Sequence, residues 1–260
     1  MPGSGSVPGW RRVSAAADRT LVLVHGWGFS RTIWEPVVAA LGGLPVVLAE
    51  LPGHGGCPNG ERLADVHDAA RVLCGQLPAG IREPVWAGWS LGGPVALAAA
   101  EQWQGPQRLA LICATPRFTA APGWPCALDP AALASFGDEL ERDRAALERR
   151  FAALCAHGGH APARLRRQLL GLMAGRPATD PGLRAGLAAL AQADLRRVWA
   201  GLDAPVWAWL ADDDPLVPGG VASGLAALRP DACLRVVPGG HVSWWEDAAG
   251  LAGFLREVMA

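Results

Sequence analysis

The chain has 260 residues, of which 51% are hydrophobic and 18% are charged, and its formal net charge at pH 7 is −1. This composition excludes an intrinsically disordered chain, which is poor in apolar residues, and a globally basic nucleic-acid-binding protein. The length fits one large domain, or a core that carries an insertion.

We expect neither a membrane span nor a secretory signal. The longest uncharged apolar stretch near the N-terminus, residues 36–49, is interrupted by glycines and a proline and is shorter than the roughly 20 residues of a membrane-spanning helix. The start of the chain lacks the continuous apolar region of a signal peptide. The six cysteines contain no Cys-x-x-Cys pair, which predicts reduced thiols and no metal site. These features together predict a cytoplasmic protein.

Six short apolar runs, each bounded by turn residues, are typical of buried strands. In chain order they cover residues 20–25, 45–49, 85–89, 109–114, 206–211 and 234–237. Segments with helical spacing lie between them, at 33–41, 63–77, 91–103, 221–228 and 247–259. This alternation predicts an α/β fold with a mostly parallel sheet and helices on both of its faces.

The alternation stops between residues 115 and 202, where helical patterns cover about 131–157, 162–174 and 181–191. We therefore expect a core made of residues 20–115 and 203–260, with a helical cap at 116–202. The cap would cover the carboxyl edge of the sheet, where ligands of open α/β sheets bind. Residues 1–19, rich in Gly, Ser and Pro, are expected to form a flexible extension.

The segment Gly88-Trp89-Ser90-Leu91-Gly92 matches the pattern Gly-x-Ser-x-Gly and lies between a predicted strand and a predicted helix. A nucleophilic serine must project from a tight turn of this kind, and flanking glycines keep other side chains out of the bend. The alternative is an ordinary glycine-rich turn. The position between strand and helix favours Ser90 as a nucleophile.

A second glycine-rich turn, which holds His25 and Trp27, directly follows the first predicted strand. The backbone N–H of Trp27 could donate to a developing oxyanion there, with the N–H of Leu91 as the second donor at the start of a helix. We interpret His25 itself as a structural histidine that bonds to neighbouring loops.

Three consecutive acids, Asp212, Asp213 and Asp214, end the strand at 206–211. A carboxylate there would hold the tautomer of a catalytic histidine, but a solvated turn also favours Asp, so spacing alone leaves all three open. His241 follows the last predicted strand and a Pro-Gly-Gly turn. The order Ser, Asp, His, each after a strand, predicts His241 as the general base.

These motifs resemble the α/β-hydrolase superfamily and, more closely, its pimeloyl-[acyl-carrier protein] methyl ester esterases of biotin synthesis. The resemblance is carried by residues 21–28, 51–55, 88–93 and 214–218, by 114–118 with 124–125, and by 150–151. It implies the α/β-hydrolase fold with an inserted helical cap. It also implies a serine carboxylesterase that needs no cofactor and no metal.

The resemblance also implies the roles of individual residues. Ser90 would be the nucleophile, His241 the base and Asp214, three residues before the Val-Pro pair, the carboxylate. Trp27 and Leu91 would be the oxyanion donors. The residues expected to contact the substrate are Trp27, Arg150 and Phe151.

Residues 149–176 hold six arginines and no acidic residue. In the family, cap arginines meet the acidic acyl carrier protein, which here implicates Arg149, Arg150, Arg164 and Arg167, although only Arg150 is in register. Such a cluster could steer an acidic partner, and its alternative is a solvated helix face. We expect no nucleic-acid or membrane partner, and a monomer.

Two other functions stay open at this point. The chain could hydrolyse free small esters or carbon–carbon bonds with the same triad and a different pocket. It could also be a catalytically silent scaffold used for binding. The presence of Ser90, Asp214 and His241 argues against a silent scaffold, which needs none of them.

Overall fold

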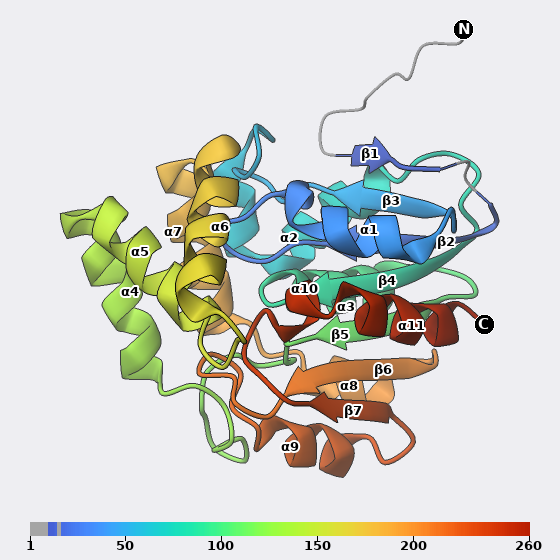
Figure 1. Ribbon diagram of the computed structural model, residues 1–260. Helices are drawn as coiled ribbons and strands as arrows, with labels where there is room; N and C mark the ends of the chain where they lie inside the picture. Colours follow the sequence, from blue (N-terminus) through green and yellow to red (C-terminus); the bar gives the residue numbers. More distant parts are fainter. Residues whose placement is uncertain (1–9, 15–16) are drawn as a thin grey trace, which may run out of the picture.

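The computed structural model describes residues 10–14 and 17–260, and a central sheet organises them (Figure 1). Its seven strands lie in the order β1-β3-β2-β4-β5-β6-β7. They are β1 (Trp10–Arg12), β2 (Arg19–Val24), β3 (Val46–Ala49), β4 (Glu83–Trp89), β5 (Arg108–Ile112), β6 (Val206–Ala211) and β7 (Cys233–Val237). Strands β2 to β7 are parallel and agree with the six predicted strands to within two residues at either end.

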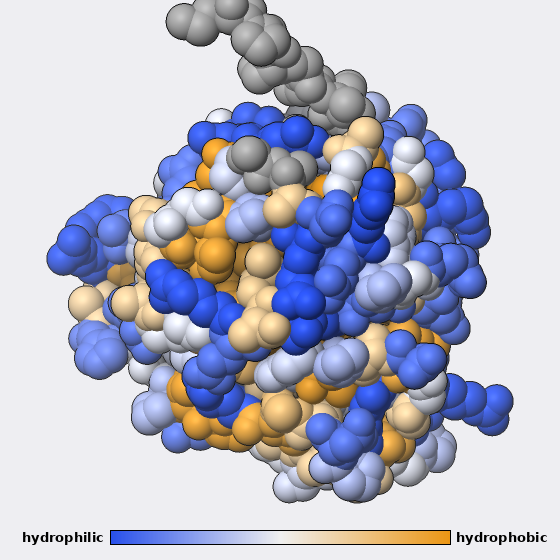
Figure 2. Space-filling model, turned by 90° about the vertical axis from the view of Figure 1, so that its right-hand side faces the viewer, coloured by the Kyte–Doolittle hydropathy of each residue, from blue (hydrophilic) through white to orange (hydrophobic). Residues whose placement is uncertain are grey.

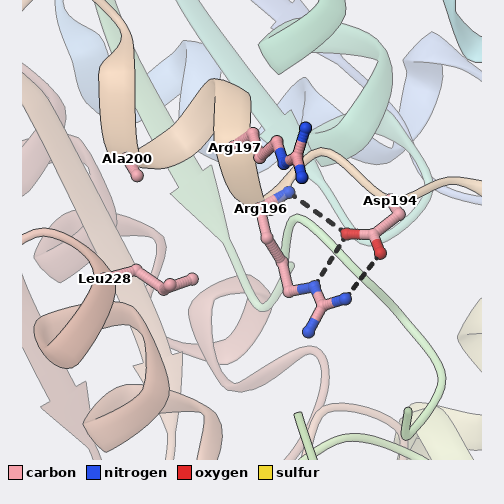
Figure 3. A pocket seen from close by; sticks show the side chains of 5 residues that line it. All are labelled: Asp194, Arg196, Arg197, Ala200 and Leu228. Atoms are coloured by element: carbon pink, nitrogen blue, oxygen red, sulfur yellow. Dashed lines mark hydrogen bonds and ion pairs between the residues drawn. The ribbon is translucent and has the colours of Figure 1, made fainter. Parts of the chain in front are cut away.

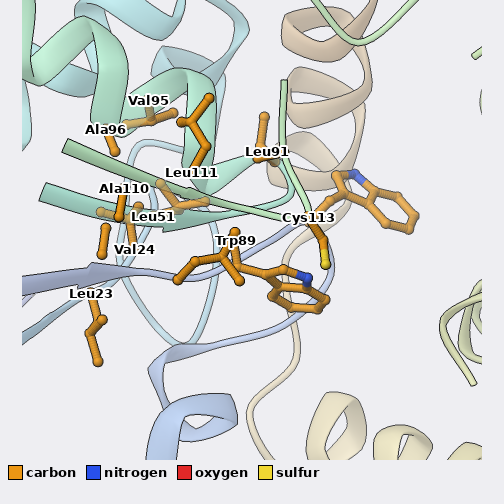
Figure 4. Close-up of a cluster of buried hydrophobic side chains, with 14 of the residues drawn as sticks. Leu23, Val24, Leu51, Trp89, Leu91, Val95, Ala96, Ala110, Leu111 and Cys113 are labelled. Carbon is orange, nitrogen blue, oxygen red and sulfur yellow. The ribbon is translucent and has the colours of Figure 1, made fainter. Parts of the chain in front are cut away.

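Helices cover both faces of this sheet, which explains why its central strands are apolar along their whole length. Helices α1 (Glu35–Leu41) and α11 (Ala248–Met259) pack together on one face, and α2 (Val66–Gly75) and α3 (Gly92–Gln102) on the other. Figure 4 shows the core that results, in which Leu23 and Val24 of β2 and Ala110 and Leu111 of β5 are buried.

Residues 10–12 were predicted to belong to a flexible N-terminal extension, but they form a strand. These residues form β1, which runs antiparallel along β3 with Trp10 opposite Ala49. The outer edge of β3 would otherwise present unpaired backbone groups, and β1 pairs with them. The rest of the predicted extension up to residue 9, and residues 15–16, lie outside the described residues.

Helices alone follow β5 before the chain enters β6. They are α4 (Pro130–Arg142), α5 (Arg144–Cys155), α6 (Pro162–Gly175), α7 (Asp180–Gln192) and α8 (Arg196–Gly201). Figure 1 shows α4 to α7 beyond the carboxyl ends of the strands. Ser90 lies at this edge, because it directly follows the last residue of β4. Helix α8 was not predicted, and it packs on α3 and on α9 (Val221–Leu228) rather than with the other four.

The helical pattern predicted at about 131–157 forms two helices, because the chain breaks at Asp143 between α4 and α5. The Asp143 carboxylate accepts a hydrogen bond from the backbone N–H of Ala146 at 2.9 Å. Asp is a strong N-cap residue and a weak residue inside a helix, so it begins a new helix here.

Two contacts fix the cap to the core. Near Gly53, a Cβ atom on Gly182 of α7 would lie 2.7 Å from the Gly53 carbonyl oxygen, so the two backbones touch. The Thr179 N–H also donates to that oxygen at 2.7 Å. At the other side, the N–H of His160 donates to Glu246 at 3.1 Å. These contacts tie α7 and the turn between α5 and α6 to the core, and His157 in that turn also lies 3.2 Å from Asp213, whereas α4 lies farther from the sheet (Figure 1).

The surface opposite the cap lies at the amino ends of the strands. Figure 2 views this face and shows hydrophilic residues spread over it among smaller apolar areas. All six cysteines are free thiols. None of the helices described is both long enough and apolar enough to cross a membrane.

Candidate active site

Ser90 lies in a sharp turn between β4 and α3. Its φ of 54° is in the left-handed region, which strains a residue with a side chain and is typical of functional sites. The flanking glycines are required by space: a Cβ atom on Gly88 would lie 2.1 Å from the Gly92 carbonyl oxygen, and one on Gly92 would lie 2.3 Å from that of Val24. The turn thus presents Ser90 at the carboxyl edge of the sheet.

His241 and Asp214 form a buried pair after β7 and β6. His241 Nδ1 lies 2.8 Å from Asp214 Oδ2, and both side chains are buried. The other oxygen of Asp214 accepts hydrogen bonds from the backbone N–H groups of Leu216 at 2.8 Å and Val217 at 3.0 Å. The carboxylate is therefore held by the backbone on one side and faces the imidazole on the other.

The neighbouring acids have other partners. Asp212 Oδ1 accepts a hydrogen bond from the N–H of Gly239 at 3.0 Å. Asp213 is exposed, and its carboxylate lies 3.2 Å from Nε2 of His157. Spacing left three candidates open, and the structure brings only Asp214 to His241.

The other ring nitrogen of His241 faces away from Asp214. Nε2 is buried and has no hydrogen-bond partner in the part of the chain that the structure describes. The ring packs against Trp89, the residue before Ser90, with 5.4 Å between centroids. The Trp89 indole N–H also donates to the His241 carbonyl oxygen at 3.0 Å. The fold therefore leaves this nitrogen unused, on a ring that packs against the residue before Ser90.

The turn that holds Trp27 packs directly on Ser90. A Cβ atom on Gly26 would lie 2.9 Å from Ser90 Cβ. Within the described ranges, no hydrogen bond is made by the backbone N–H of Trp27 or by that of Leu91. Both predicted oxyanion donors are therefore unused by the fold. The Trp27 indole N–H instead donates to the Leu183 carbonyl oxygen at 2.9 Å.

An apolar pocket leads from Ser90 into the cap. Ser90 is its one polar lining residue, and the others are Trp27, Phe118, Leu128, Leu133, Phe136, Phe151, Leu187, Leu190 and Leu216. Trp27, Phe136 and Phe151 meet edge to face, with centroids 4.8 to 6.4 Å apart. The cavity volume is about 10 Å³, space for about one water molecule. The aromatic side chains therefore nearly close the pocket.

Phe151 and Trp27 were predicted to contact the substrate, and both line this pocket. Arg150 does not line it. Its guanidinium pairs with Glu139 at 3.0 Å and lies 4.7 Å from the ring centroid of Phe136. Sequence reasoning missed Phe136 and the leucines because the apolar face of a cap helix looks the same whether it lines a core or a pocket.

A second pocket lies between α8 and α9 (Figure 3). Its polar lining is occupied by an internal pair, since Arg196 donates to both oxygens of Asp194 at 2.7 and 2.8 Å. It contains none of the predicted site residues. We therefore place the candidate active site at Ser90.

Beside the Ser90 turn lies a buried group of His25, Glu50 and His54. Burial raises the pKa of Glu50, but hydrogen bonds and charge attraction from His25 and Arg31 outweigh it, so the pKa is below its usual value. Burial and the adjacent His25 lower the pKa of His54 to about 3. The His54 ring is therefore neutral in the folded protein at ordinary pH.

This neutral His54 makes folding sensitive to acid. Below about pH 6.5 the unfolded chain binds a proton at His54 and the folded chain does not. The contribution of His54 to the free energy of unfolding is therefore fully present above that pH and decreases as the pH falls toward 3. The slope from this group reaches about 1.4 kcal/mol per pH unit. We expect urea unfolding of His54→Gln to show a flatter pH dependence than the wild type between about pH 7 and pH 4.5. The exposed His160→Gln serves as control, and equal slopes for His54→Gln and the wild type would contradict the prediction.

With this geometry in place, comparison with known proteins gives the family. The sequence pattern of the Alpha/beta hydrolase family matches residues 21–254. The chain belongs to this family, which confirms the predicted fold class and the resemblance on which it rested.

Curated relatives share more sequence identity with this chain than the similar solved structures do. Pimeloyl-[acyl-carrier protein] methyl ester esterase of Methylococcus capsulatus is 37% identical over 245 residues, which cover 92% of this chain and 94% of that protein. The protein of the same name from Stenotrophomonas maltophilia is 35% identical over 244 residues, 92% of each. An esterase from Exiguobacterium antarcticum has a TM-score of 0.85 at 18% identity, covering 96% of this chain and 95% of that one, and this likeness shows the fold alone.

Proposed function

We propose that the protein is a serine carboxylesterase that hydrolyses the methyl ester of pimeloyl-[acyl carrier protein], a step in biotin precursor synthesis. The buried Asp214–His241 pair next to the Ser90 turn carries this proposal, because these groups supply a nucleophile, a base and an orienting carboxylate. The relatives of the same name, 35 to 37% identical, support the substrate.

In the reaction, Ser90 Oγ attacks the ester carbonyl carbon while its proton moves to Nε2 of His241. The N–H groups of Trp27 and Leu91 donate to the oxyanion that forms. Methanol leaves with the proton from His241, and an acyl-enzyme remains on Ser90. Water then attacks the acyl-enzyme, gives its proton to His241 and releases the free carboxylate as Ser90 is reprotonated.

The pocket suits the methylene chain of the substrate. Its wall is apolar apart from Ser90, and burying methylene groups contributes about 0.8 kcal/mol each. The methyl ester would lie at Ser90, with the carrier-bound end at the surface of the cap. Because the pocket is nearly closed, the side chains of Phe136 and Phe151 must separate as the chain enters.

The four predicted carrier contacts differ in their surroundings. Arg149 lies 3.9 Å from Asp143, and Arg150 is tied to Glu139 and Phe136. Arg164 and Arg167 are exposed on α6, and over residues 10–14 and 17–260 neither has an ion pair. These two are the cleaner test of carrier binding, since changing them disturbs no internal contact.

We expect Arg164→Glu/Arg167→Glu to lower kcat/KM for the carrier-bound methyl ester about tenfold at low salt, because such charges steer an acidic partner. Hydrolysis of free dimethyl pimelate should stay within about twofold of wild type. The wild-type reaction on the carrier-bound ester should also slow as salt rises, since the Debye length is about 8 Å at physiological ionic strength. Steady-state kinetics on both substrates provide the measurement.

The double variant Arg12→Glu/Arg82→Glu, on the core, is the matched control and should behave as wild type on both substrates. Equal loss on both esters would mean that the α6 arginines hold the cap together. No preference of the wild type for the carrier-bound ester would instead favour a hydrolase of free esters. A cytoplasmic location and a monomeric state stay predictions.

A further inference from the structure

The buried group of His25, Glu50 and His54 takes no part in the reaction described above. The three side chains are 0%, 2% and 0% exposed. A buried carboxylate is destabilising unless it is paired and hydrogen-bonded. Its retention beside the Ser90 turn therefore calls for a specific role.

Each member of the group holds the backbone of one loop, residues 25–31. His25 Nδ1 lies 2.9 Å from the carbonyl oxygen of Gly26. His54 Nε2 accepts a hydrogen bond from the N–H of Gly28 at 3.1 Å. Glu50 Oε1 accepts one from the N–H of Arg31 at 2.9 Å. The backbone is thus held on both sides of Trp27, whose own N–H is left unused.

Glu50 connects these contacts. Its Oε1 lies 2.9 Å from Nε2 of His25, a nitrogen that accepts a hydrogen bond from the Leu51 N–H at 3.1 Å. The same carboxylate oxygen accepts from the Arg31 N–H. Its Oε2 lies 3.5 Å from the guanidinium of Arg31 and 3.8 Å from that of Arg176, which reaches in from the end of α6. Arg176 also donates to the carbonyl oxygen of Gly55. The Glu50 carboxylate therefore contacts groups of the loop, of the core and of the cap.

We propose that Glu50 is a positioning residue: through His25 and the Arg31 N–H it fixes the loop so that the Trp27 N–H points at the oxyanion formed on Ser90. This role rests on the proposed function, which makes that N–H an oxyanion donor. Groups that stabilise a transition state must be held within about 0.5 Å of their productive geometry. The loop that carries this donor needs such a support, because the direction of a backbone N–H is set by the conformation of the backbone on both sides of it.

The test is Glu50→Gln, which keeps the size of the side chain and removes its charge. We expect kcat on a small free ester to fall about tenfold to hundredfold, because complete loss of one oxyanion donor costs about 10²–10³ in kcat and a displaced donor costs less. KM should change less than about threefold, since the Trp27 N–H donates to the oxyanion of the transition state and contributes little to binding of the ground-state ester.

A trifluoromethyl ketone reports on the oxyanion site directly. Ser90 Oγ adds to its carbonyl carbon, the proton moves to His241, and the carbonyl oxygen becomes an oxyanion at the same donors. Its affinity for Glu50→Gln should fall by about the same factor as kcat/KM. A merely structural role of Glu50 would lower thermal stability without this matched loss.

Glu83→Gln is the control, because Glu83 is also ion-paired, with Arg19 at 2.8 Å and Arg108 at 3.6 Å, and partly buried, but lies at the far end of β4. Its kcat and ketone affinity should equal those of wild type. Equal kcat for the two folded variants, or a lower kcat with unchanged ketone affinity, overturns the proposal.

If Glu50→Gln does not fold, Glu50→Asp serves the same measurements, since it keeps the charge and withdraws the carboxylate from Arg31 by one methylene. The wild type separates this proposal from the proposed function. A wild type inactive on every ester means that the function is wrong. An active wild type with an equally active Glu50 variant means that only the positioning role is wrong.

Discussion

Replacing Ser90 with alanine should abolish ester hydrolysis while leaving the fold intact. The Oγ atom is the proposed attacking group, and loss of a serine nucleophile lowers kcat by a factor on the order of 10⁶ in the subtilisin precedent. The protein should still unfold at the wild-type temperature, because alanine fits the same turn and removes one small polar group. Release of acid from a free methyl ester measures the loss of activity, and thermal unfolding measures the stability of the fold.

The variant Ser223→Ala, which removes an exposed hydroxyl on α9, controls for general effects and should keep full activity. A folded Ser90→Ala protein with activity within about tenfold of wild type would remove Ser90 from the mechanism, and with it the assignment of the pocket.

The second large effect should come from Asp214→Asn. The asparagine can still accept from the N–H groups of Leu216 and Val217, but it would turn an amide N–H toward His241 Nδ1. That contact favours the wrong tautomer, the one that carries its proton on Nε2 and cannot accept the proton of Ser90. The trypsin precedent for this change is a loss of about 10⁴ in kcat.

The neighbouring acids provide matched controls. Asp212→Asn keeps an oxygen for the N–H of Gly239, and Asp213→Asn changes an exposed pair with His157. Both should retain kcat within about tenfold of wild type. If either lowers kcat more than Asp214→Asn does, the pair between Asp214 and His241 is not the working one.

The sequence predicted the core well because its signals are local. Each strand from β2 to β7 is a short apolar run between turn residues. Ser90 directly follows one of these runs, and His241 follows another after a Pro-Gly-Gly turn. The glycines around Ser90 are needed by the turn itself, so the motif reports a local geometry. The family resemblance then assigned roles that no single run could give.

What could not be predicted depends on contacts between distant segments. Spacing alone could not choose Asp214 among three acids, because its partner is a histidine 27 positions further along the chain, and only the family resemblance selected it. The wall of the pocket combines residues of the core, α4, α5 and α7. Glu50 follows β3 and has no motif of its own, and only its contacts with His25 and Arg31 distinguish it from an ordinary acid. Strand β1 is three residues long, too short for a periodic signal.

The two ties between cap and core make the pocket asymmetric in how it can open. Gly182 touches the backbone of Gly53, and His160 is held by Glu246, so α6 and α7 cannot retreat without breaking contacts to the core. Phe151 lies on α5, and His157, just beyond the end of that helix, contacts Asp213 of the core at 3.2 Å. Phe136 lies on α4, which packs on α5 and α7. The substrate passage therefore has a wall fixed to the core, made by α5 to α7, and a wall on α4 that can turn about the break at Asp143.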